Sequence, residues 1–463
     1  MARTKGPTHT WISAIPVPSR KNGKPGPAKG SVKTVSFAGQ NFPVSPVLDT
    51  LYWYMAERHR MHQHRLAGED PPWSNDEIMN SFPFTNVFRV YDRTTQYILR
   101  NVIRKGSQDL EEMCFRVILF RLFNKLDTWE HMEELLGTPT LKWSEFDVET
   151  YDSVLSDLAA DGTALYCGCY ISPAPPFGWH KNHSNHLRLV QVMMDNKLPV
   201  ELKGFKHLKD ANGRLCLYPS IGAFIAQQYV HHALVLIRLS SSRFARHVNR
   251  LLLDLNMTPH FKWSEREWAA LGPGSSACLR KIFGPSVSRY EQEALQYLYE
   301  SQMSHFTRLG IVKNQVPRLC DARPAGVSSV DIEHSLCECE KYSRGRFPHI
   351  KGKRTVVGRP YVQNRERITA ELPSHWLQPL PKPPPPPAPP AVHEANGVPF
   401  YEVSHIVAER NVESGRYLVR WVGYGPEDDW WLTEKELEDG AGEVLQMWNN
   451  TKDRINKRIE ALR

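Results

Sequence analysis

A short run of polar side chains has the residue types and the spacing of a binding site. Its members, at positions i, i+3, i+4 and i+7, are Arg89, Asp92, Arg93 and Gln96. On one helix this spacing places the guanidinium, carboxylate and amide groups in a single stripe next to an apolar face. Such a stripe fits a ligand pocket or an ion-paired helix surface, and the residues alone favour neither.

Two glycine-containing segments, 217–228 and 270–281, have the composition of a tight turn that opens a helix. Backbone N–H groups at the start of a helix can bind a DNA phosphate. The residues of the second segment that would serve such a site are Gly272, Gly274, Arg280 and Lys281. An ordinary helix–helix turn has the same pattern, and the sequence leaves both interpretations open.

The elements that must position these residues are mostly helical between residues 46 and 350. Leu48, Leu51, Tyr52 and Met55 repeat with helical spacing, and residues 113–123 are so apolar that they predict a central buried helix. We find no alternation of strands and helices typical of a nucleotide-binding α/β sheet, and no Gly-x-x-x-x-Gly-Lys-Ser/Thr motif. The fold class predicted for this region is therefore all-α.

Length and composition bound the organisation of the chain. Its 463 residues suffice for two or three domains, and a net charge of +8 is compatible with nucleic-acid binding. The predicted regions are a disordered basic tail (1–45), a helical domain (46–350), a disordered Pro-rich linker (351–397) and a C-terminal domain (398–463). The polyproline core of the linker, residues 379–390, predicts an extended spacer that keeps two domains apart.

Targeting signals, cysteines and the first residues bear on where the protein acts. Nothing resembles a signal peptide or a membrane span, and the 8 cysteines are mostly scattered, so we expect an intracellular protein with reduced thiols. Residues Ala2–Lys5 copy the first residues of histone H3. A match of this length is most simply a coincidence, with a methylated histone mimic as the alternative.

The last sixty or so residues combine alternating strands with a helix. Polar and apolar residues alternate through 417–422, which predicts a half-buried strand, with 403–407 as its partner. Residues 443–462 carry an apolar stripe at helical spacing. A small β-barrel followed by a C-terminal helix is the predicted architecture.

The runs Phe400-Tyr-Glu-Val403, Tyr417-Leu-Val-Arg-Trp-Val-Gly-Tyr424 and Asp428-Asp-Trp-Trp431 resemble a chromodomain. By position, the resemblance implies a methyl-lysine cage of Tyr401, Trp421 and Tyr424, in which aromatic faces attract a trimethylammonium group. It also implies peptide contacts by Asp428 and Asp429. The segment Trp431-Leu432-Thr433 departs from the usual Trp-Glu-Pro, which puts the rim of the peptide groove in doubt.

The partner implied by the chromodomain resemblance is a methylated histone tail, with H3 as the first candidate, bound as an added β-strand. The expected location is chromatin in the nucleus. The alternative is a small barrel whose aromatic residues only fill its core.

Several ordered motifs run through residues 48–348. They are Asn86-x-x-Arg89-x-x-Asp92-Arg93-x-x-Gln96, Phe115-Arg116-x-x-Leu119-Phe120-x-Leu122-Phe123-Asn124, Asn182-His183-x-x-His186-Leu187, Gly222-x-Phe224, Gly272-Pro273-Gly274 and Asp331-x-Glu333-x-x-Leu336-Cys337-Glu338-x-x-Lys341-Tyr342. Together they resemble the helical domain of 5-hydroxymethyluracil DNA kinases, a family also described as α-glutamyl/putrescinyl thymine pyrophosphorylases, with viral and fungal members. The resemblance implies an all-helical fold akin to helix-hairpin-helix DNA glycosylases, and a modified thymine or uracil base of DNA as substrate.

One departure from that family concerns the segment before Asp254. In the family an Asp-Leu-Asn segment follows the Gly-x-Phe turn closely, whereas here residues 230–252, with the composition of a translated intron, lie between them. We hypothesise a gene-model error, which a transcript without this segment would support and peptides from it would refute. The glycosylase likeness makes Asp254 the first candidate for a catalytic carboxylate, with a helix N-cap as the alternative.

Chemistry on a base in duplex DNA requires the base to be flipped out of the stack. In the resemblance, Arg89 and Arg93 would hold a phosphate, while Asn86 or Gln96 would contact the uracil edge. The glycines expected to grip the DNA backbone are Gly222, Gly272 and Gly274.

A kinase would in addition need Mg²⁺ and ATP. The candidate Mg²⁺ ligands are Asp92, Asp254 and Glu338, and Lys341 fits a phosphate-binding or a structural role. The sequence leaves the reaction open between kinase, glycosylase and transferase. The rival hypotheses are an inactive DNA-binding and histone-reading adaptor and a chromodomain protein derived from a mobile element.

Three closely spaced histidines, His180, His183 and His186, have the residue type of zinc ligands. Their spacing of i, i+3 and i+6 does not keep them on one face of a helix, and no convincing fourth ligand accompanies them. We therefore predict no metal site at these histidines, and expect capping or DNA-facing roles instead.

Overall fold

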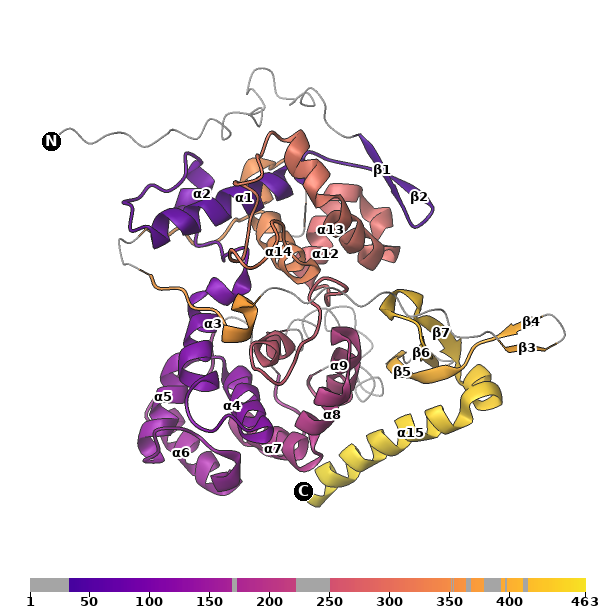
Figure 1. The fold of residues 1–463 in the computed structure, drawn as a ribbon. Helices are drawn as coiled ribbons and strands as arrows, with labels where there is room; N and C mark the ends of the chain where they lie inside the picture. Colours follow the sequence, from indigo (N-terminus) through magenta and orange to yellow (C-terminus); the bar gives the residue numbers. More distant parts are fainter. Residues whose placement is uncertain are drawn as a thin grey trace. The chain divides into compact units, whose positions relative to one another are not determined.

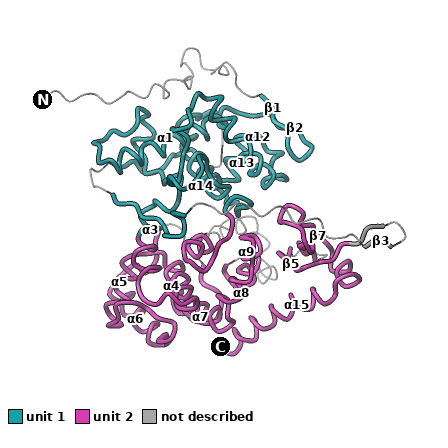
Figure 2. Tube along the Cα trace, in the orientation of Figure 1, with its two compact units in different colours: residues 1–96, 265–380 teal, residues 97–264, 381–463 magenta. Residues whose placement is uncertain are grey.

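The computed structural model describes residues 33–168, 173–221, 250–350, 352, 354–363, 368–378, 393–395, 398–410 and 415–463. The chain divides into two compact units (Figures 1 and 2). Unit 1 is formed by residues 1–96 and 265–380, and unit 2 by residues 97–264 and 381–463. Neither unit coincides with a predicted domain, because the predicted helical domain 46–350 contributes to both.

Unit 1 is built around one long helix. Its elements are β1 (Thr34–Phe37), β2 (Gln40–Pro43), α1 (Val47–Leu66), α2 (Glu77–Ser81), α12 (Pro273–Phe283), α13 (Glu291–Arg308) and α14 (Ser329–Arg346). The first of its two chain segments ends within α3 (Arg93–Tyr97). The predicted apolar stripe Leu48, Leu51, Tyr52 and Met55 is fully buried on α1, where α12, α13 and α14 pack against the helix. The predicted helix is therefore confirmed, and it forms the axis of the unit.

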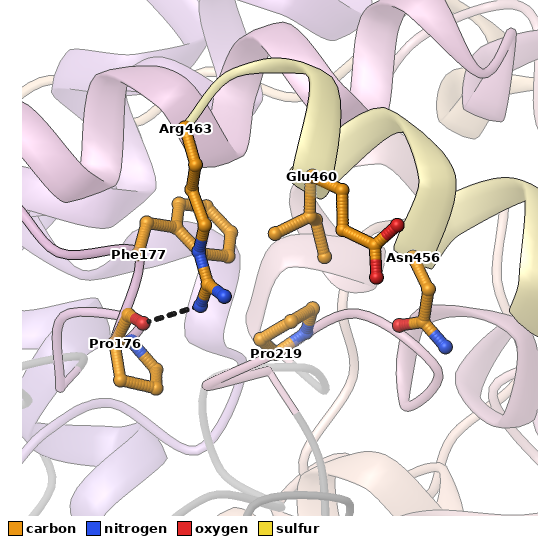
Figure 3. Close-up of a pocket in the computed structure, with 7 residues that line it drawn as sticks. Pro176, Phe177, Pro219, Asn456, Glu460 and Arg463 are labelled. Atoms are coloured by element: carbon orange, nitrogen blue, oxygen red, sulfur yellow. Dashed lines mark hydrogen bonds between the residues drawn. The ribbon is translucent and has the colours of Figure 1, made fainter.

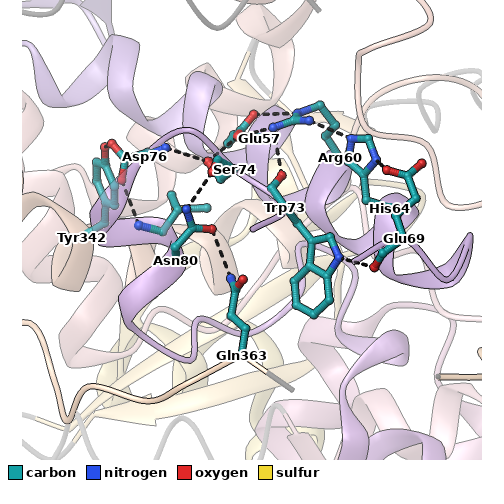
Figure 4. Close-up of polar contacts among 11 residues, drawn as sticks. Glu57, Arg60, His64, Glu69, Trp73, Ser74, Asp76, Asn80, Tyr342 and Gln363 are labelled. Carbon is teal, nitrogen blue, oxygen red and sulfur yellow. Dashed lines mark hydrogen bonds and ion pairs between the residues drawn. The ribbon is translucent and has the colours of Figure 1, made fainter. Parts of the chain in front are cut away.

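Buried polar contacts fix the segment after α1 and tie it to α14 (Figure 4). The Glu57 carboxylate, fully buried, accepts hydrogen bonds from Arg60 at 2.6 and 2.9 Å and from the Ser74 hydroxyl at 2.5 Å. The Tyr342 hydroxyl of α14 donates to Asp76 at the start of α2, at 2.8 Å. Because each of these buried groups has a partner, the network holds α1, α2 and α14 in register with one another.

Two predicted disordered regions contain ordered structure where the structure describes them. Residues 34–43, inside the predicted tail, form an antiparallel hairpin with Val35 and Phe42 buried. Within the predicted linker lie a 3₁₀ turn, Ser374–Leu377, and the strand β3 (His393–Ala395), which pairs with β4 (Val398–Phe400) at the start of the predicted C-terminal domain. In the hairpin, the buried Val35 and Phe42 account for the order.

Unit 2 contains the other helices and a small sheet. Its elements are α4 (Leu110–Phe123), α5 (Leu126–Leu135), α6 (Val148–Ala160), α7 (Asn182–Asp195), α8 (Leu198–Gly204), α9 (Leu208–Leu215), β5 (Val403–Arg410), β6 (Arg416–Trp421), β7 (Trp430–Thr433) and α15 (Glu434–Ala461). Every residue of α4 from Met113 to Phe123 is buried, which confirms the predicted central helix. Residues 250–256 are also helical.

The C-terminal part of unit 2 has the predicted sheet and helix. The strands are antiparallel in the order β5-β6-β7. Helix α15 begins with a capping box between Thr433 and Glu436, kinks at Ala441, and buries Leu445, Trp448, Ile455 and Ile459 on one stripe. The multidomain prediction, a mostly helical region followed by a small sheet with a C-terminal helix, is thus confirmed.

Some predictions lie outside the described residues. They concern the histone-like start Ala2–Lys5, the turn glycine Gly222, the polyproline core 379–390 and most of the segment 230–252. Among the residues that the structure does describe, no helix is both long and apolar enough to cross a membrane.

Candidate functional site

The polar stripe predicted on one helix is interrupted at Asp92. A 3₁₀ turn spans Arg89–Tyr91, Asp92 has an extended backbone (φ −72°, ψ 144°), and only then does α3 begin. The Asp92 carboxylate accepts the backbone N–H of Asn86 at 2.8 Å, and the Asn86 amide donates to the Tyr91 carbonyl at 2.9 Å. The single-helix prediction was wrong because these side-chain hydrogen bonds to the backbone offer a turn instead.

Helix α14 brings three more polar side chains to this turn. The His334 imidazole lies 3.5 Å from the Asp92 carboxylate. Glu338 accepts the backbone N–H of Thr85 at 3.5 Å and pairs with Lys341 at 2.5 Å. The first and last motifs of the sequence, far apart along the chain, therefore meet in unit 1.

Helix α1 supplies the remaining members. Arg58 donates to the Phe84 carbonyl at 3.1 Å, and the His62 ring stacks on Tyr91 with centroids 4.6 Å apart. The hydroxyl of Tyr54 is buried in the same region and is electrostatically coupled to Glu338 and Asp92. We call the whole group the Asp92 cluster; it comprises Tyr54, Arg58, His62, Thr85, Asn86, Asp92, His334, Glu338 and Lys341.

Sequence reasoning missed Tyr54, Arg58, His62 and His334. Tyr54, Arg58 and His62 stand on α1 among core aromatic and apolar residues, and the pattern of a buried helix hides them. A signal was present at His334, which lies within the last motif, three residues after Asp331 and four before Glu338.

Burial and neighbouring groups shift the pKa values of three members of the cluster. Burial opposes ionisation of Asp92, but the nearby His334 imidazole and the Asn86 N–H outweigh it, so the pKa of Asp92 lies below its ordinary value. Burial, helped by Arg58, lowers the pKa of His62 to about 3. Burial, helped by Glu338, raises the pKa of Tyr54 well above its ordinary value. At neutral pH Asp92 is therefore a carboxylate, while the His62 imidazole and the Tyr54 phenol are neutral.

Several buried polar atoms of the cluster have no hydrogen-bond partner among the described residues. They are Tyr54 Oη, His62 Nε2, Thr85 Oγ1, Asn86 Oδ1 and His334 Nε2. Buried polar atoms are nearly always paired, and orphaned ones call for a water, an ion or a ligand. Amide, imidazole and hydroxyl groups are also the groups that hydrogen-bond the edge of a nucleobase.

The other members of the predicted stripe lie differently. Arg93 is exposed and Arg89 is half-buried. Gln96 is buried, and its amide both donates to the Glu371 carbonyl and accepts the Glu371 N–H, each at 2.8 Å. The backbone of residue 371 thus holds the amide that was predicted to read a base.

Gly272 and Gly274 stand at the start of α12, as predicted, but a carboxylate occupies the helix end. The Gly272 N–H donates to Glu333 of α14 at 3.2 Å, and Ser275 donates to the same oxygen at 2.8 Å. A Cβ on Gly274 would lie 2.8 Å from the Cys337 sulfur. This corrects the predicted phosphate site: Glu333 takes the position of the anion, and Gly274 permits close packing of α12 on α14.

The two basic residues of α12 also have protein partners. Lys281 is buried, 3.2 Å from Glu340 and 2.9 Å from the Ser343 hydroxyl. Arg280 pairs with Glu291 at 3.3 Å. A buried Lys281 cannot contact a DNA phosphate, so its predicted role is corrected to a structural one, whereas Arg280 remains partly exposed.

Asp254 lies in unit 2, fully buried, where it forms an ion pair with Arg121 of α4. Arg121 also donates to Asn124 at 2.6 Å. An ion pair in a helical core is first of all a structural feature, and the Asp92 cluster belongs to the other unit.

The histidines of α7 have local partners. His183 lies 3.0 Å from the Ser156 hydroxyl and 3.4 Å from Asp152, and His186 lies 2.8 Å from the Tyr166 hydroxyl. Within the described part of the chain, no group of His, Cys, Asp and Glu side chains is arranged to hold a metal ion.

The predicted cage residues converge on one another in unit 2. The ring of Tyr401 lies 5.9 Å from that of Trp421 and 5.8 Å from that of Tyr424, at interplanar angles of 60° and 72°. Strand pairing sets Trp421 opposite Val403, and Gly423, with φ of 83°, turns the chain so that Tyr424 returns. The rings are in tilted and edge-to-face contact, and Tyr401 is 49% exposed, so its ring can be reached from solvent.

The two acidic residues after the cage differ. Asp428 is exposed, as a peptide contact requires. The side chain of Asp429 is fully buried and pairs with Arg420 and, at 2.7 Å, with Lys209. Its predicted contact with a peptide is therefore corrected, because its carboxylate is already fully engaged.

The fold and both sites place the chain in a class: a mostly helical protein joined to a chromodomain. Residues 45–352 match the family described as 5-hmdU DNA kinase, helical domain, and the chain belongs to that family. Residues 401–451 match the chromo (chromatin organisation modifier) domain.

A curated relative is the 5-hmdU DNA kinase of Bacillus phage SP10. It is 21% identical over 331 residues, which are 66% of this chain and 47% of the phage protein. The chain thus spans about half the length of this relative. No solved structure matches the chain.

Proposed function

We propose that this is a chromatin-associated protein that reads a methyl-lysine histone tail and acts on a modified pyrimidine base of DNA, of the 5-hydroxymethyluracil type. The observation that carries the proposal is the Asp92 cluster, in which the first and last motifs of the family region meet around unpaired polar atoms. The aromatic residues Tyr401, Trp421 and Tyr424 support the other part of the proposal, the reading of methyl-lysine.

The cluster has groups suited to a flipped pyrimidine. The Asn86 Oδ1 atom would accept the N3–H of a uracil ring, and the hydroxyls of Tyr54 and Thr85 would reach its carbonyl oxygens. The anionic Asp92, next to His334, would accept a hydrogen bond from a 5-hydroxymethyl group. Thymine lacks that hydroxyl and would leave the partly buried carboxylate without this donor, which would provide selectivity.

If the reaction is phosphoryl transfer, the cluster would supply part of a metal site, and the phosphates of ATP would have to complete it, since the described side chains form no metal site by themselves. Mg²⁺ prefers carboxylate oxygens, which Asp92 and Glu338 supply, and Lys341 next to Glu338 would bind a phosphate. Mg²⁺ with ATP would supply the phosphoryl group and neutralise its charge. In that reaction Asp92 would also take the proton of the hydroxymethyl group, since its pKa keeps it ionised.

An adaptor without turnover is the second candidate, and two observations favour it. The Gln96 amide is bound to the backbone of Glu371, and Asp254 is held by Arg121. Two of the predicted catalytic residues are thus engaged by the protein itself, while base binding at the Asp92 cluster needs neither.

The catalytic part is tested by mass spectrometry of nucleosides. The purified protein, with ATP and Mg²⁺, is incubated with duplex DNA carrying thymine, 5-hydroxymethyluracil or 5-hydroxymethylcytosine. A mass gain of one phosphate, lost in Asp92→Asn, supports a DNA-base kinase, and release of the free base points to a glycosylase. Unchanged DNA with intact base binding would favour the adaptor.

The reading part is tested by peptide binding. Trp421→Ala should weaken binding of a trimethyl-lysine histone H3 peptide about 10-fold, as expected for the loss of a strong cation–π contact. Tyr361→Ala, which removes an aromatic ring that is 40% exposed in unit 1, is the control and should bind as the wild type does. Equal binding of methylated and unmethylated peptides by the wild type would reject a methyl-lysine reader.

A further inference from the structure

Helix α9 and strand β5 approach each other unusually closely. The register of β5 on β6 shifts between Ile406, opposite Val419, and Ala408, opposite Leu418, so that Val407 forms a bulge. A Cβ added to Gly213 of α9 would lie 1.7 Å from the carbonyl oxygen of this Val407. The side-chain-free position on α9 therefore allows backbone-to-backbone packing at the edge strand of the chromodomain, and α9 covers that edge.

A chain of alternating charges runs across the same contact. Arg420 of β6 donates to Asp210 of α9 at 2.9 and 3.3 Å and also pairs with Asp429. Lys209 of α9 lies 2.7 Å from Asp429 and donates to the Pro426 carbonyl at 3.0 Å. The arrangement gives each charge a partner of opposite sign from the other side of the contact.

These charges are deeply buried, which separates them from a chance surface encounter. The side chains of Arg420 and Asp210 are 4% and 3% exposed. Burial opposes the charged form of Asp210, yet His405 and Arg420 hold its pKa below the ordinary value. Charges lose their hydration at such a site only where good geometry and opposite charge compensate for it.

The end of α15 makes a second contact in unit 2 (Figure 3). Arg463 donates to the Pro176 carbonyl at 2.9 Å, and Arg458 pairs with Asp195 of α7. Asn456 and Ile459 line a pocket of about 190 Å³ together with the loop that contains Pro176. The sheet of the chromodomain therefore contacts α9, and its C-terminal helix contacts α7 and the loop that contains Pro176.

We propose that the chromodomain is docked on α9 and on the α7 region, and that the methyl-lysine cage is thereby carried at a fixed position on unit 2. The Pro-rich composition of the linker predicted a spacer that keeps the chromodomain apart from the helical domain. The contacts of Gly213, Arg420 and Arg458 correct this prediction. In the docked domain Tyr401 is 49% exposed and Asp428 is also exposed. Docking therefore leaves these two residues accessible from solvent.

The test is hydrogen–deuterium exchange on the full-length protein. Gly213→Ala introduces a methyl group that β5 can accommodate only by moving away. Gly204→Ala, at the end of the neighbouring helix α8, is the matched control, because a Cβ there meets nothing within 4 Å. In Gly213→Ala, amides of residues 208–215 and 403–410 should exchange at least 10-fold faster, with α4 unchanged, and Gly204→Ala should match the wild type.

Exchange in Gly213→Ala that equals that of the wild type would overturn the proposal. If this variant also opens α4, Lys209→Met decides, because it removes the ion pair with Asp429 without adding bulk. Faster exchange confined to 208–215 and the chromodomain then supports docking, and unchanged exchange rejects it. Neither readout depends on the proposed function, since no peptide or DNA is added.

Discussion

The Asp92 carboxylate and the His334 imidazole lie 3.5 Å apart in unit 1, although one belongs to the first sequence motif and the other to the last. The contact depends on the extended backbone of Asp92, which separates the 3₁₀ turn from α3. It joins the region after α1 to α14 at the centre of the candidate base site.

The pH dependence of stability should report the state of Asp92. Its pKa in the folded protein lies below the value of about 3.9 of an unfolded chain. A lowered pKa contributes stability above the unfolded value, and this contribution disappears as the pH falls through the folded value. Asp92→Asn should lower the free energy of unfolding by about 1–3 kcal/mol at pH 7, and the difference from the wild type should shrink from about pH 5 downward. Urea unfolding at several pH values measures this, and a difference independent of pH would contradict it. The exposed Asp428→Asn variant is the control.

His62 should make the protein sensitive to a milder fall in pH. Burial lowers its pKa to about 3, from an ordinary 6.5. Below pH 6.5 this histidine is protonated in the unfolded chain but stays neutral in the folded protein. The free energy of unfolding therefore decreases as the pH falls, until the folded pKa is reached. His62→Phe should keep the stacking on Tyr91 and reduce the loss between pH 7 and pH 4.5 by about 1–3 kcal/mol. The same substitution at the exposed His349 should leave the pH profile unchanged, and equal profiles for His62→Phe and the wild type would refute the prediction.

The sequence predicted well the elements whose pattern is local. The buried helices α1 and α4 and the sheet of the chromodomain follow from apolar periodicity and from short motifs. These features depend on neighbours within a few residues, which a sequence displays directly.

What the sequence could not predict depends on partners far along the chain. Nothing near Gly272 indicates that Glu333 would cap its helix, and nothing near Lys281 indicates burial beside Glu340. Tyr54 and Arg58 were missed because functional and core residues share one helix. The turn at Asp92 was missed because helical spacing does not reveal competition from side-chain hydrogen bonds.

The ion pair between Asp254 and Arg121 should prove structural. Asp254→Asn leaves the buried Arg121 charge without its partner and should lower the free energy of unfolding by about 3–5 kcal/mol. The double variant Arg121→Met, Asp254→Leu should recover most of this loss, because two apolar side chains replace the pair. Thermal unfolding measures both. An Asp254→Asn variant with unchanged stability and no activity on modified DNA would instead identify a catalytic carboxylate.

Gly274 should be required for packing and not for DNA binding. Its Cβ position lies 2.8 Å from the Cys337 sulfur, so Gly274→Ala should cost about 1–3 kcal/mol of stability through overpacking. Adding Cys337→Ala should restore part of the loss. Denaturant unfolding and a DNA-binding titration are compared for the two variants. Unchanged stability with weaker DNA binding would revive the phosphate-binding interpretation.

The central claim, recognition of a modified pyrimidine at the Asp92 cluster, is tested most directly by equilibrium binding of duplex DNA with a single 5-hydroxymethyluracil or a thymine at the same position. The account predicts that the full-length protein prefers the modified duplex by about 10-fold or more. Asn86→Leu should abolish the preference while retaining salt-dependent binding to both duplexes. Asn101→Leu, which removes an amide that donates to the Tyr97 carbonyl in unit 2, should retain the preference. Equal affinity of the wild type for the two duplexes, or a preference that survives Asn86→Leu, would contradict the account.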